Sequence, residues 1–152
     1  MEIGLSPFLP EALLVNLPEI DTQHEEVFTR IELLKAGCFE NTYVDIAEFQ
    51  GLVDFFALHF ASEERIAKEA GVDFAAHAKV HRDTLGLLRK ALGDVLNGGH
   101  DAHSFLRYAE YWFERHIRED DKLFVATLQK SRHYTLPRSH RPAADRYFSA
   151  RV

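Results

Sequence analysis

Four segments with helical periodicity dominate this sequence and constrain what it can fold into. Apolar residues recur at intervals of three and four over residues 18–36, 43–70, 73–96 and 102–129, which is the spacing of one helix face. The short stretches between these segments contain glycine or Asn-Gly-Gly, and such residues favour helix ends. No segment shows the strict alternation that is typical of a strand. The sequence therefore predicts an all-α chain with four helices.

The connections between the helices decide how the helices pack. We expect the first helix to end at Gly37 and the second at Gly71, because glycine readily adopts the conformation that closes a helix. Short connections place sequential helices antiparallel. The predicted fold is an up-down-up-down antiparallel four-helix bundle within a single domain, residues 1–130. We expect residues 1–17 to form an extended arm against the bundle and residues 131–152 to form a basic tail.

Charge and hydropathy limit the partners and the location that we expect. The chain has a net charge of −6, but residues 131–152 hold five arginines and one aspartate. An acidic body argues against nucleic acid as a partner, and the basic tail is a candidate contact for a protein partner. No apolar run reaches the roughly 20 residues of a membrane span, and residues 1–10 lack the pattern of a secretory signal. We therefore expect no integral membrane segment and a cytoplasmic location.

Ionisable residues interrupt the apolar stripe of every predicted helix. Burying that many of them is costly unless they pair with each other or bind a metal. His59 and Glu63 are four residues apart, as are His77 and His81, so each pair shares one helix face. The full inward set is an aspartate together with His24, His59, Glu63, His77, His81 and His116. Because every helix contributes a member, the set can meet at one level of the bundle, and we predict a metal site.

Spacing alone leaves the aspartate of this set open. Asp120 is four residues after His116, which fits one helical turn. Asp121 is five residues after His116, but it falls on an apolar row of the same helix. Both aspartates stay candidates at this point.

The number of candidate ligands indicates the kind of metal site. Seven ligands exceed the four that a tetrahedral zinc ion takes, and they suit two metal ions bridged by carboxylates. Five imidazoles, two bridging carboxylates and a bridging oxide or hydroxide fill about eleven of the roughly twelve positions of two octahedral iron ions. One position then stays open for a small ligand.

The motifs around these residues resemble those of the hemerythrin family, and within it those of the single-domain bacterial hemerythrins, or bacteriohemerythrins. The motifs are IDTQH at 20–24, HFASEE at 59–64, HAKVH at 77–81 and WFERHIREDDKLF at 112–124. Their order and spacing match the family pattern over about residues 16–128. The resemblance implies the four-helix bundle of this family, which the related myohemerythrin also has.

The resemblance also implies a ligand set and a function. Carried onto this chain, the family pattern makes the metal ligands His24, His59, Glu63, His77, His81, His116 and Asp121. The implied cofactor is a pair of iron ions bridged by an oxide or hydroxide and by two carboxylates, with Asp121 rather than Asp120 as the second one. The implied function is reversible dioxygen binding at this non-haem di-iron site, as a carrier, store or sensor rather than as an enzyme.

Two positions near the first helix depart from the family pattern. Leu9 stands where the family usually has a tryptophan in the arm. Asn16 stands where the family usually has a glycine just before the first helix. Asparagine tolerates left-handed backbone angles, so we expect the exchange at Asn16 to be mild.

Reversible oxygen binding needs a dry and apolar pocket, because water and protons promote oxidation of the metal. Apolar side chains within a turn of the candidate ligands are predicted to line such a pocket, and they are Val27, Phe56, Phe60, Trp112, Phe113 and Ile117. Trp112 is the strongest candidate for a pocket wall, because it lies one turn before His116 and matches a tryptophan of the family.

Two other functions would use the same residues. A di-iron oxidase, peroxidase or nitric-oxide-handling enzyme would share the ligands, but it needs a polar residue near the open position, and the sequence identifies none. The other alternative is a structural or interaction bundle that binds iron or zinc, or no metal.

Overall fold

The computed structural model describes residues 9–40 and 45–131. Its helices are α1 (Pro18–Glu40), α2 (Ile46–Ala70), α3 (Ala75–Leu96), α4 (Ala102–His116) and α5 (Lys122–Lys130). A short 3₁₀ helix, η1 (Glu11–Leu13), precedes α1, and a π-helical turn, η2 (Ile117–Asp121), joins α4 to α5. These two described ranges contain no strand.

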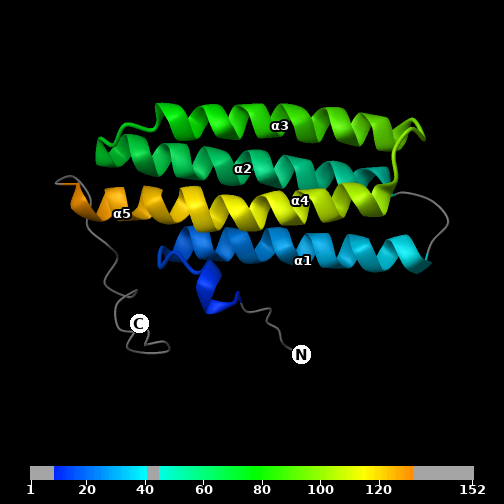
Figure 1. The fold of residues 1–152 in the computed structure, drawn as a ribbon, viewed down its shortest axis with the longest axis horizontal. Helices are drawn as coiled ribbons and strands as arrows, with labels where there is room; N and C mark the ends of the chain where they lie inside the picture. The colour runs from blue at the N-terminus through cyan, green and yellow to red at the C-terminus, as the bar shows by residue number, and fades with distance from the viewer. Residues whose placement is uncertain (1–8, 41–44, 132–152) are drawn as a thin grey trace.

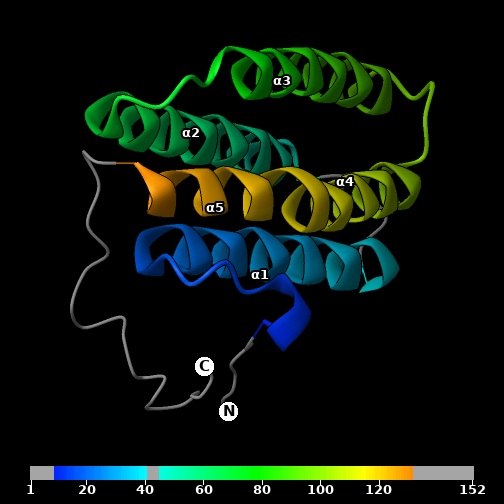
Figure 2. The same cartoon turned by 60° about the vertical axis from the view of Figure 1, so that its left-hand side comes forward.

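The helices form four rods that lie side by side and alternate in direction (Figure 1). α4, η2 and α5 make up one continuous rod. α1 packs against α2 and α4, and α3 packs against the same two helices. A second view shows α3 beside α2 and α1 beside the rod of α4 and α5 (Figure 2). This is an up-down-up-down antiparallel four-helix bundle, which confirms the predicted fold class.

The two predicted helix ends at glycine have different outcomes. Gly71 ends α2 with a φ of 71°, in the left-handed conformation that we expected. The prediction that the first helix ends at Gly37 is wrong, because α1 continues to Glu40. Leu34 and Cys38, on either side of this glycine, both pack against the core. Glycine permits a helix end but does not impose one, and here packing of the last turn outweighs its weak helix propensity.

The start of α2 is also later than predicted. Asp45 is the N-cap, and its carboxylate accepts a hydrogen bond from the backbone N–H of Glu48 at 3.2 Å. The predicted start at Tyr43 lies outside the described residues. An aspartate at this position satisfies one of the free N–H groups of the first turn, which explains why α2 begins at Ile46.

The fourth rod contains a turn that periodicity does not reveal. The sequence predicts a regular helix over residues 102–129, whereas the structure has a π-helical turn at Ile117–Asp121. A π turn holds one residue more than an α turn does. The residues after η2 are therefore shifted by one position relative to a regular continuation of α4.

Residues 9–17 form an arm that packs on the bundle. Its buried side chains are Leu13, Val15 and Leu17, and η1 contacts η2. Asn16 has a φ of 65°, so asparagine does adopt the left-handed conformation expected of it. Asp21 anchors the arm by accepting hydrogen bonds from the backbone N–H groups of Val15 at 2.9 Å and Asn16 at 3.0 Å. Residues 1–8 and 132–152 lie outside the described residues, so the extended start of the arm and the basic tail stay predictions.

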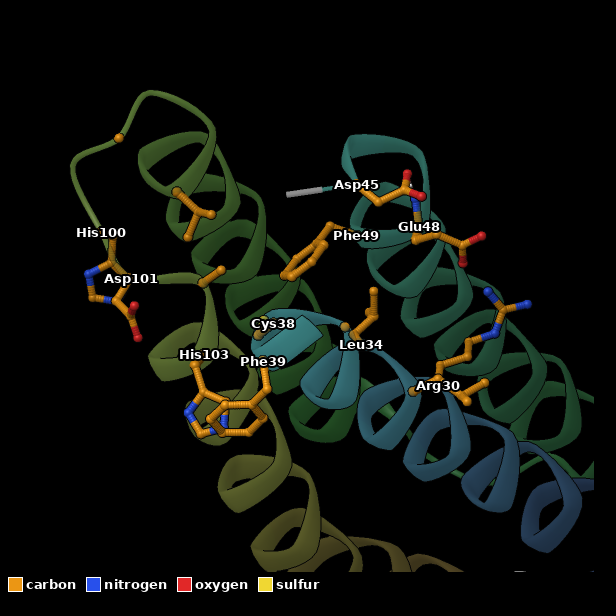
Figure 3. Close-up of a pocket in the computed structure, with 15 residues that line it drawn as sticks. Arg30, Leu34, Cys38, Phe39, Asp45, Glu48, Phe49, His100, Asp101 and His103 are labelled. Atoms are coloured by element: carbon orange, nitrogen blue, oxygen red, sulfur yellow. Dashed lines mark hydrogen bonds between the residues drawn. The ribbon is translucent and has the colours of Figure 1, made fainter. Parts of the chain in front are cut away.

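A pocket of about 850 Å³ opens where α1 ends and α2 begins (Figure 3). Cys38 and Phe39 of α1, Phe49 of α2, and His100 and His103 near the start of α4 belong to its lining. The pocket shares no lining residue with the ionisable cluster that the sequence predicts. None of the helices in the described ranges combines the length and the apolar character of a membrane span.

Candidate metal centre

Seven ionisable side chains meet in the interior of the bundle. They are His24 of α1, His59 and Glu63 of α2, His77 and His81 of α3, His116 of α4, and Asp121 of η2. These are the residues that the sequence and the resemblance single out. Six of them are buried, and the exception is His77, whose side chain is 12% exposed.

The seven side chains form two overlapping groups. The three-histidine group consists of His77, His81, His116, Glu63 and Asp121, and the two-histidine group consists of His24, His59, Glu63 and Asp121. Within each group, one ligand atom from each residue lies within 4.8 Å of all the others. The two carboxylates are thus common to both groups.

Each carboxylate turns one oxygen toward each group. Asp121 Oδ1 lies 3.1 Å from His77 Nε2, and Asp121 Oδ2 lies 3.1 Å from His24 Nε2. Glu63 Oε1 lies 3.2 Å from His77 Nε2, and Glu63 Oε2 lies 3.2 Å from His59 Nε2. Carboxylates in this position are able to bridge two ions.

Several polar atoms of the cluster are buried without a hydrogen-bond partner. They are both ring nitrogens of His24, Nε2 of His59, both carboxylate oxygens of Glu63, and Oδ2 of Asp121. An unpaired buried polar atom costs about 1–3 kcal/mol, so such a concentration is unfavourable unless a ligand satisfies it. Imidazole and carboxylate are donors that suit iron. The donor set and the unpaired atoms together fit a metal centre.

Burial and mutual attraction set the charges in the cluster. Burial disfavours the charged form of His24, but the nearby carboxylates of Asp121 and Glu63, at 3.1 and 3.8 Å from its Nε2, outweigh burial and raise the pKa of His24 to about 9. The same balance raises the pKa of His77 to about 9. Burial opposes ionisation of Glu63, yet its histidine partners hold the pKa of this carboxyl well below its usual range. Burial also opposes ionisation of Asp121, and its histidine neighbours likewise hold its pKa well below the usual range. Both carboxylates are therefore ionised, and protons compete with a metal ion for the imidazole nitrogens.

The π-helical turn brings Asp121 into the cluster. In a regular helix the fourth residue after His116 would lie on the same face as His116. Because η2 contains one extra residue, the fifth residue, Asp121, lies on that face instead. Asp121 is fully buried. The side chain of Asp120 is 44% exposed, and its Oδ2 accepts a hydrogen bond from His116 Nδ1 at 2.8 Å. Both aspartates thus contact His116, at opposite ring nitrogens.

Gln23 is a site residue that the sequence analysis does not single out. Its Oε1 accepts a hydrogen bond from His59 Nδ1 at 2.7 Å, and its Nε2 donates to Ser62 Oγ at 3.0 Å. A hydrogen bond on the outer ring nitrogen fixes the tautomer and the plane of a histidine ligand. Gln23 directly precedes His24 in the IDTQH motif, but its partner His59 lies on a different helix, so spacing along one helix could not reveal the contact.

The aromatic side chains predicted to line a pocket divide between the two groups. Phe113 contacts the two-histidine group in T-shaped arrangements, with ring centroids 5.1 Å from His24 and 5.8 Å from His59. Phe56 packs on Phe113 at 5.2 Å. Val27 and Ile117 are fully buried in the same core.

The other two predicted pocket residues stack on the three-histidine group instead. Phe60 lies 3.9 Å from His81 with an interplanar angle of 10°, and Trp112 lies 4.6 Å from His116 with an angle of 13°. Phe74, which the sequence analysis does not assign to the site, stacks on His77 at 4.6 Å and 17°. Every histidine of the three-histidine group therefore has a nearly parallel aromatic neighbour.

This architecture is that of a metal-binding four-helix bundle, and comparison with known sequences specifies the family. The Hemerythrin HHE cation binding domain matches residues 15–128. The bacteriohemerythrin of Pseudomonas paraeruginosa (strain DSM 24068 / PA7) is 34% identical over 123 residues, which cover 78% of this chain and 79% of that protein. The bacteriohemerythrin of Methylococcus capsulatus (strain ATCC 33009 / NCIMB 11132 / Bath) is 27% identical over 116 residues, or 74% of this chain and 88% of that protein. The chain therefore belongs to the hemerythrin family, among the bacterial hemerythrins.

Solved structures agree on the fold. A crystal structure of wild-type hemerythrin superimposes with a TM-score of 0.69 at 24% identity, covering 82% of this chain and 98% of the other. At this identity the likeness bears on the fold alone, and it supports the four-helix bundle.

Proposed function

We propose that this protein binds dioxygen reversibly at a non-haem di-iron centre whose ligands are the seven clustered side chains. The observation that carries the proposal is that two groups of ligand atoms share Glu63 and Asp121. Two shared carboxylates suit two neighbouring ions bridged also by an oxide or hydroxide, whereas a single tetrahedral ion would leave several donors unused. When bound, iron supplies the redox chemistry by which dioxygen is taken up and released.

The two groups offer unequal numbers of donors. The three-histidine group provides three imidazoles and two carboxylates, and the two-histidine group provides one imidazole fewer. With one bridging oxygen added, the first group fills an octahedral ion and the second leaves one position free. We therefore assign the dioxygen position to the two-histidine group.

The side chains next to this group favour a carrier over an oxidising enzyme. Phe56, Phe113 and Val27 are fully buried, and the rings of Phe56 and Phe113 pack together beside His24 and His59. These apolar side chains exclude water and protons, which would otherwise promote irreversible oxidation. A histidine-rich donor set also carries less negative charge than a carboxylate-rich one, and so stabilises highly oxidised metal less.

The test is metal analysis combined with an ultraviolet-visible spectrum of the reduced protein before and after exposure to air. We expect about two iron ions per chain and a visible band that forms with oxygen and disappears when oxygen is removed. Two iron ions without a reversible band would replace the proposal with an oxidase, peroxidase or nitric-oxide-handling enzyme. Zinc, or no metal, would leave a structural or interaction bundle.

Location and partners stay predictions. The cytoplasmic location rests on the sequence pattern alone. The protein partner is expected at the basic tail, residues 131–152, of which residues 132–152 lie outside the described residues.

A further inference from the structure

The seven clustered side chains are not equally shielded from the surface. The side chains of His24, His59 and Glu63 have no exposed surface, and those of His116 and Asp121 are 1% exposed. The His77 side chain is 12% exposed, and the His81 side chain is 5% exposed. The accessible edge of the cluster is therefore on the first turns of α3, and both residues there belong to the three-histidine group.

Two aromatic rings border His77 at this edge. Phe74, the N-cap residue of α3, stacks on the His77 ring at 4.6 Å, and Phe124 of α5 lies 5.4 Å from it. The two phenylalanines also touch each other, with ring centroids 4.9 Å apart. They come from different helices, so a small displacement of either ring would widen the space beside His77.

The ring contacts also distinguish the two groups. His77, His81 and His116 each lie flat against an aromatic ring, at interplanar angles of 10° to 17°. His24 and His59 instead lie nearly perpendicular to the ring of Phe113, at angles of 88° and 86°. A flat stack restricts rotation of an imidazole more than an edge contact does, and ligands held in place before binding lose less entropy when a metal arrives.

We propose that the cluster is filled in order, with the three-histidine group taking the first metal ion from the surface beside His77 and the two-histidine group taking the second. This inference rests on the proposed di-metal function. A metal ion from solvent has a shorter route to the three-histidine group, because His77 is partly exposed. The additional imidazole and the stacked rings also give this group the higher affinity for a metal ion. The two-histidine group fills second, because His24 and His59 have no exposed surface and this group offers one imidazole fewer.

The chain contains a spectroscopic reporter for the first step. Trp112 is the only tryptophan in the sequence, and it stacks on His116 of the three-histidine group. Co²⁺ is paramagnetic and quenches tryptophan fluorescence at short range, and its visible bands report its coordination. Titration of the metal-stripped, full-length protein with Co²⁺ therefore follows the filling without any oxygen chemistry.

The order is tested with a matched pair of ligand variants, His59→Ala and His81→Ala. We expect the first equivalent of Co²⁺ to produce most of the Trp112 quenching in the unmodified protein. His59→Ala should keep this first step, and His81→Ala should weaken it at least tenfold. Equal weakening by both substitutions, or weakening by His59→Ala alone, would overturn the order. An unmodified protein that binds no second equivalent would instead contradict the di-metal function itself.

The route is tested by the rate of quenching after rapid mixing with Co²⁺. Phe74→Leu shortens the ring that covers His77, and we expect quenching to become at least threefold faster. Phe49→Leu is the control, since Phe49 is also a buried phenylalanine but lies at the start of α2, away from the cluster. A Phe74→Leu rate equal to that of the unmodified protein would exclude this route, provided that circular dichroism shows the same helix content.

Discussion

His59 owes its orientation to a side chain on another helix. Gln23 accepts the hydrogen bond of its outer ring nitrogen at 2.7 Å and is itself held by Ser62. Gln23→Leu removes this acceptor while keeping a similar side-chain volume. Because loss of such an outer partner typically costs about 10–100-fold in metal affinity, we expect the second Co²⁺ equivalent to bind at least tenfold more weakly, as measured by calorimetric titration.

Gln50 provides a matched control for this substitution. It is an exposed glutamine of α2 that bonds to Asp54 one turn away. Gln50→Leu should leave both binding steps unchanged. If Gln23→Leu and Gln50→Leu bind the second Co²⁺ equivalent with the same affinity, packing alone orients His59.

Asn16 tests the link between backbone angle and stability. Its φ of 65° lies in the left-handed region, where a β-branched side chain is strongly disfavoured. Asn16→Val should lower the free energy of unfolding by about 1–2 kcal/mol, and Asn16→Gly should change it by less than about 0.5 kcal/mol, since glycine accepts this conformation. Urea unfolding measures the free energy of both variants.

Asn97 provides the control. Its φ is −90°, so Asn97→Val should leave the free energy of unfolding nearly unchanged. An equal loss of stability at both asparagines would exclude backbone strain as the cause.

At the scale of single residues, the sequence could predict which residues are chemically unusual but not all of their contacts. His59 and Glu63 stand out because they break an apolar stripe, and the stripe also predicts that they point inward. Gln23 does not stand out, since a polar residue beside a histidine has no distinctive spacing. That the seven residues bind iron stays a prediction, although they do lie together.

The π-helical turn η2 is the element that aligns the fourth rod with the cluster. One helical residue corresponds to about 100° of rotation. Deleting Glu119 would remove the extra residue of η2, leave a regular helix, and return Asp121 to the fourth position after His116. Because the fourth residue shares the face of His116, we expect the deletion variant to keep both Co²⁺ equivalents and its helix content.

Insertion of one residue into η2 is the control for the deletion of Glu119, because it shifts the helical register in the opposite direction. One alanine inserted after Glu119 would turn Asp121 by about another 100° away from the cluster. We expect this variant to lose tight binding of both ions, because Asp121 serves both groups. Titration with Co²⁺ compares the two, and equal binding by the deletion and insertion variants would show that α5 adjusts independently of the helical register.

The sequence could predict the other elements better than η2. Long apolar stripes indicate helices, and Gly71 marks the end of α2 as expected. In the sequence, a π turn shows only as a shift of one residue in the apolar pattern along the helix. This shift is the reason why spacing alone could not choose between Asp120 and Asp121. The family resemblance favours Asp121, and the structure supplies the physical reason for it. The continuation of α1 past Gly37 depends on tertiary packing of Cys38, which local propensity does not contain.

At the scale of the whole molecule, the fold follows from pattern and connection length. Four amphipathic helices with short connections have few ways to bury their apolar faces, and the antiparallel bundle is the simplest of them. The arm was less predictable, because its attachment depends on Asp21 reaching back to the backbone of Val15 and Asn16. Such a contact has no periodic signature.

Metal binding at the cluster should also contribute to the stability of the whole bundle. Each of the four rods contributes at least one candidate ligand, and each group joins three rods. Two bound ions together would therefore cross-link all four rods and satisfy polar atoms that otherwise lack partners. Binding to the folded state alone stabilises it by about 4 kcal/mol when free metal exceeds Kd a thousandfold. For a chain of about 150 residues each kcal/mol raises Tm by about 2–4 °C.

Chelation should therefore lower the Tm of this protein by about 10 °C relative to the form loaded with two equivalents of metal. Thermal unfolding followed by circular dichroism measures the difference. A double variant, His24→Ala with His81→Ala, removes one ligand from each group, and its Tm should no longer respond to metal. If chelation leaves the Tm of the unmodified protein unchanged, the packed helices alone account for its stability and the buried carboxylates are satisfied by the histidines around them.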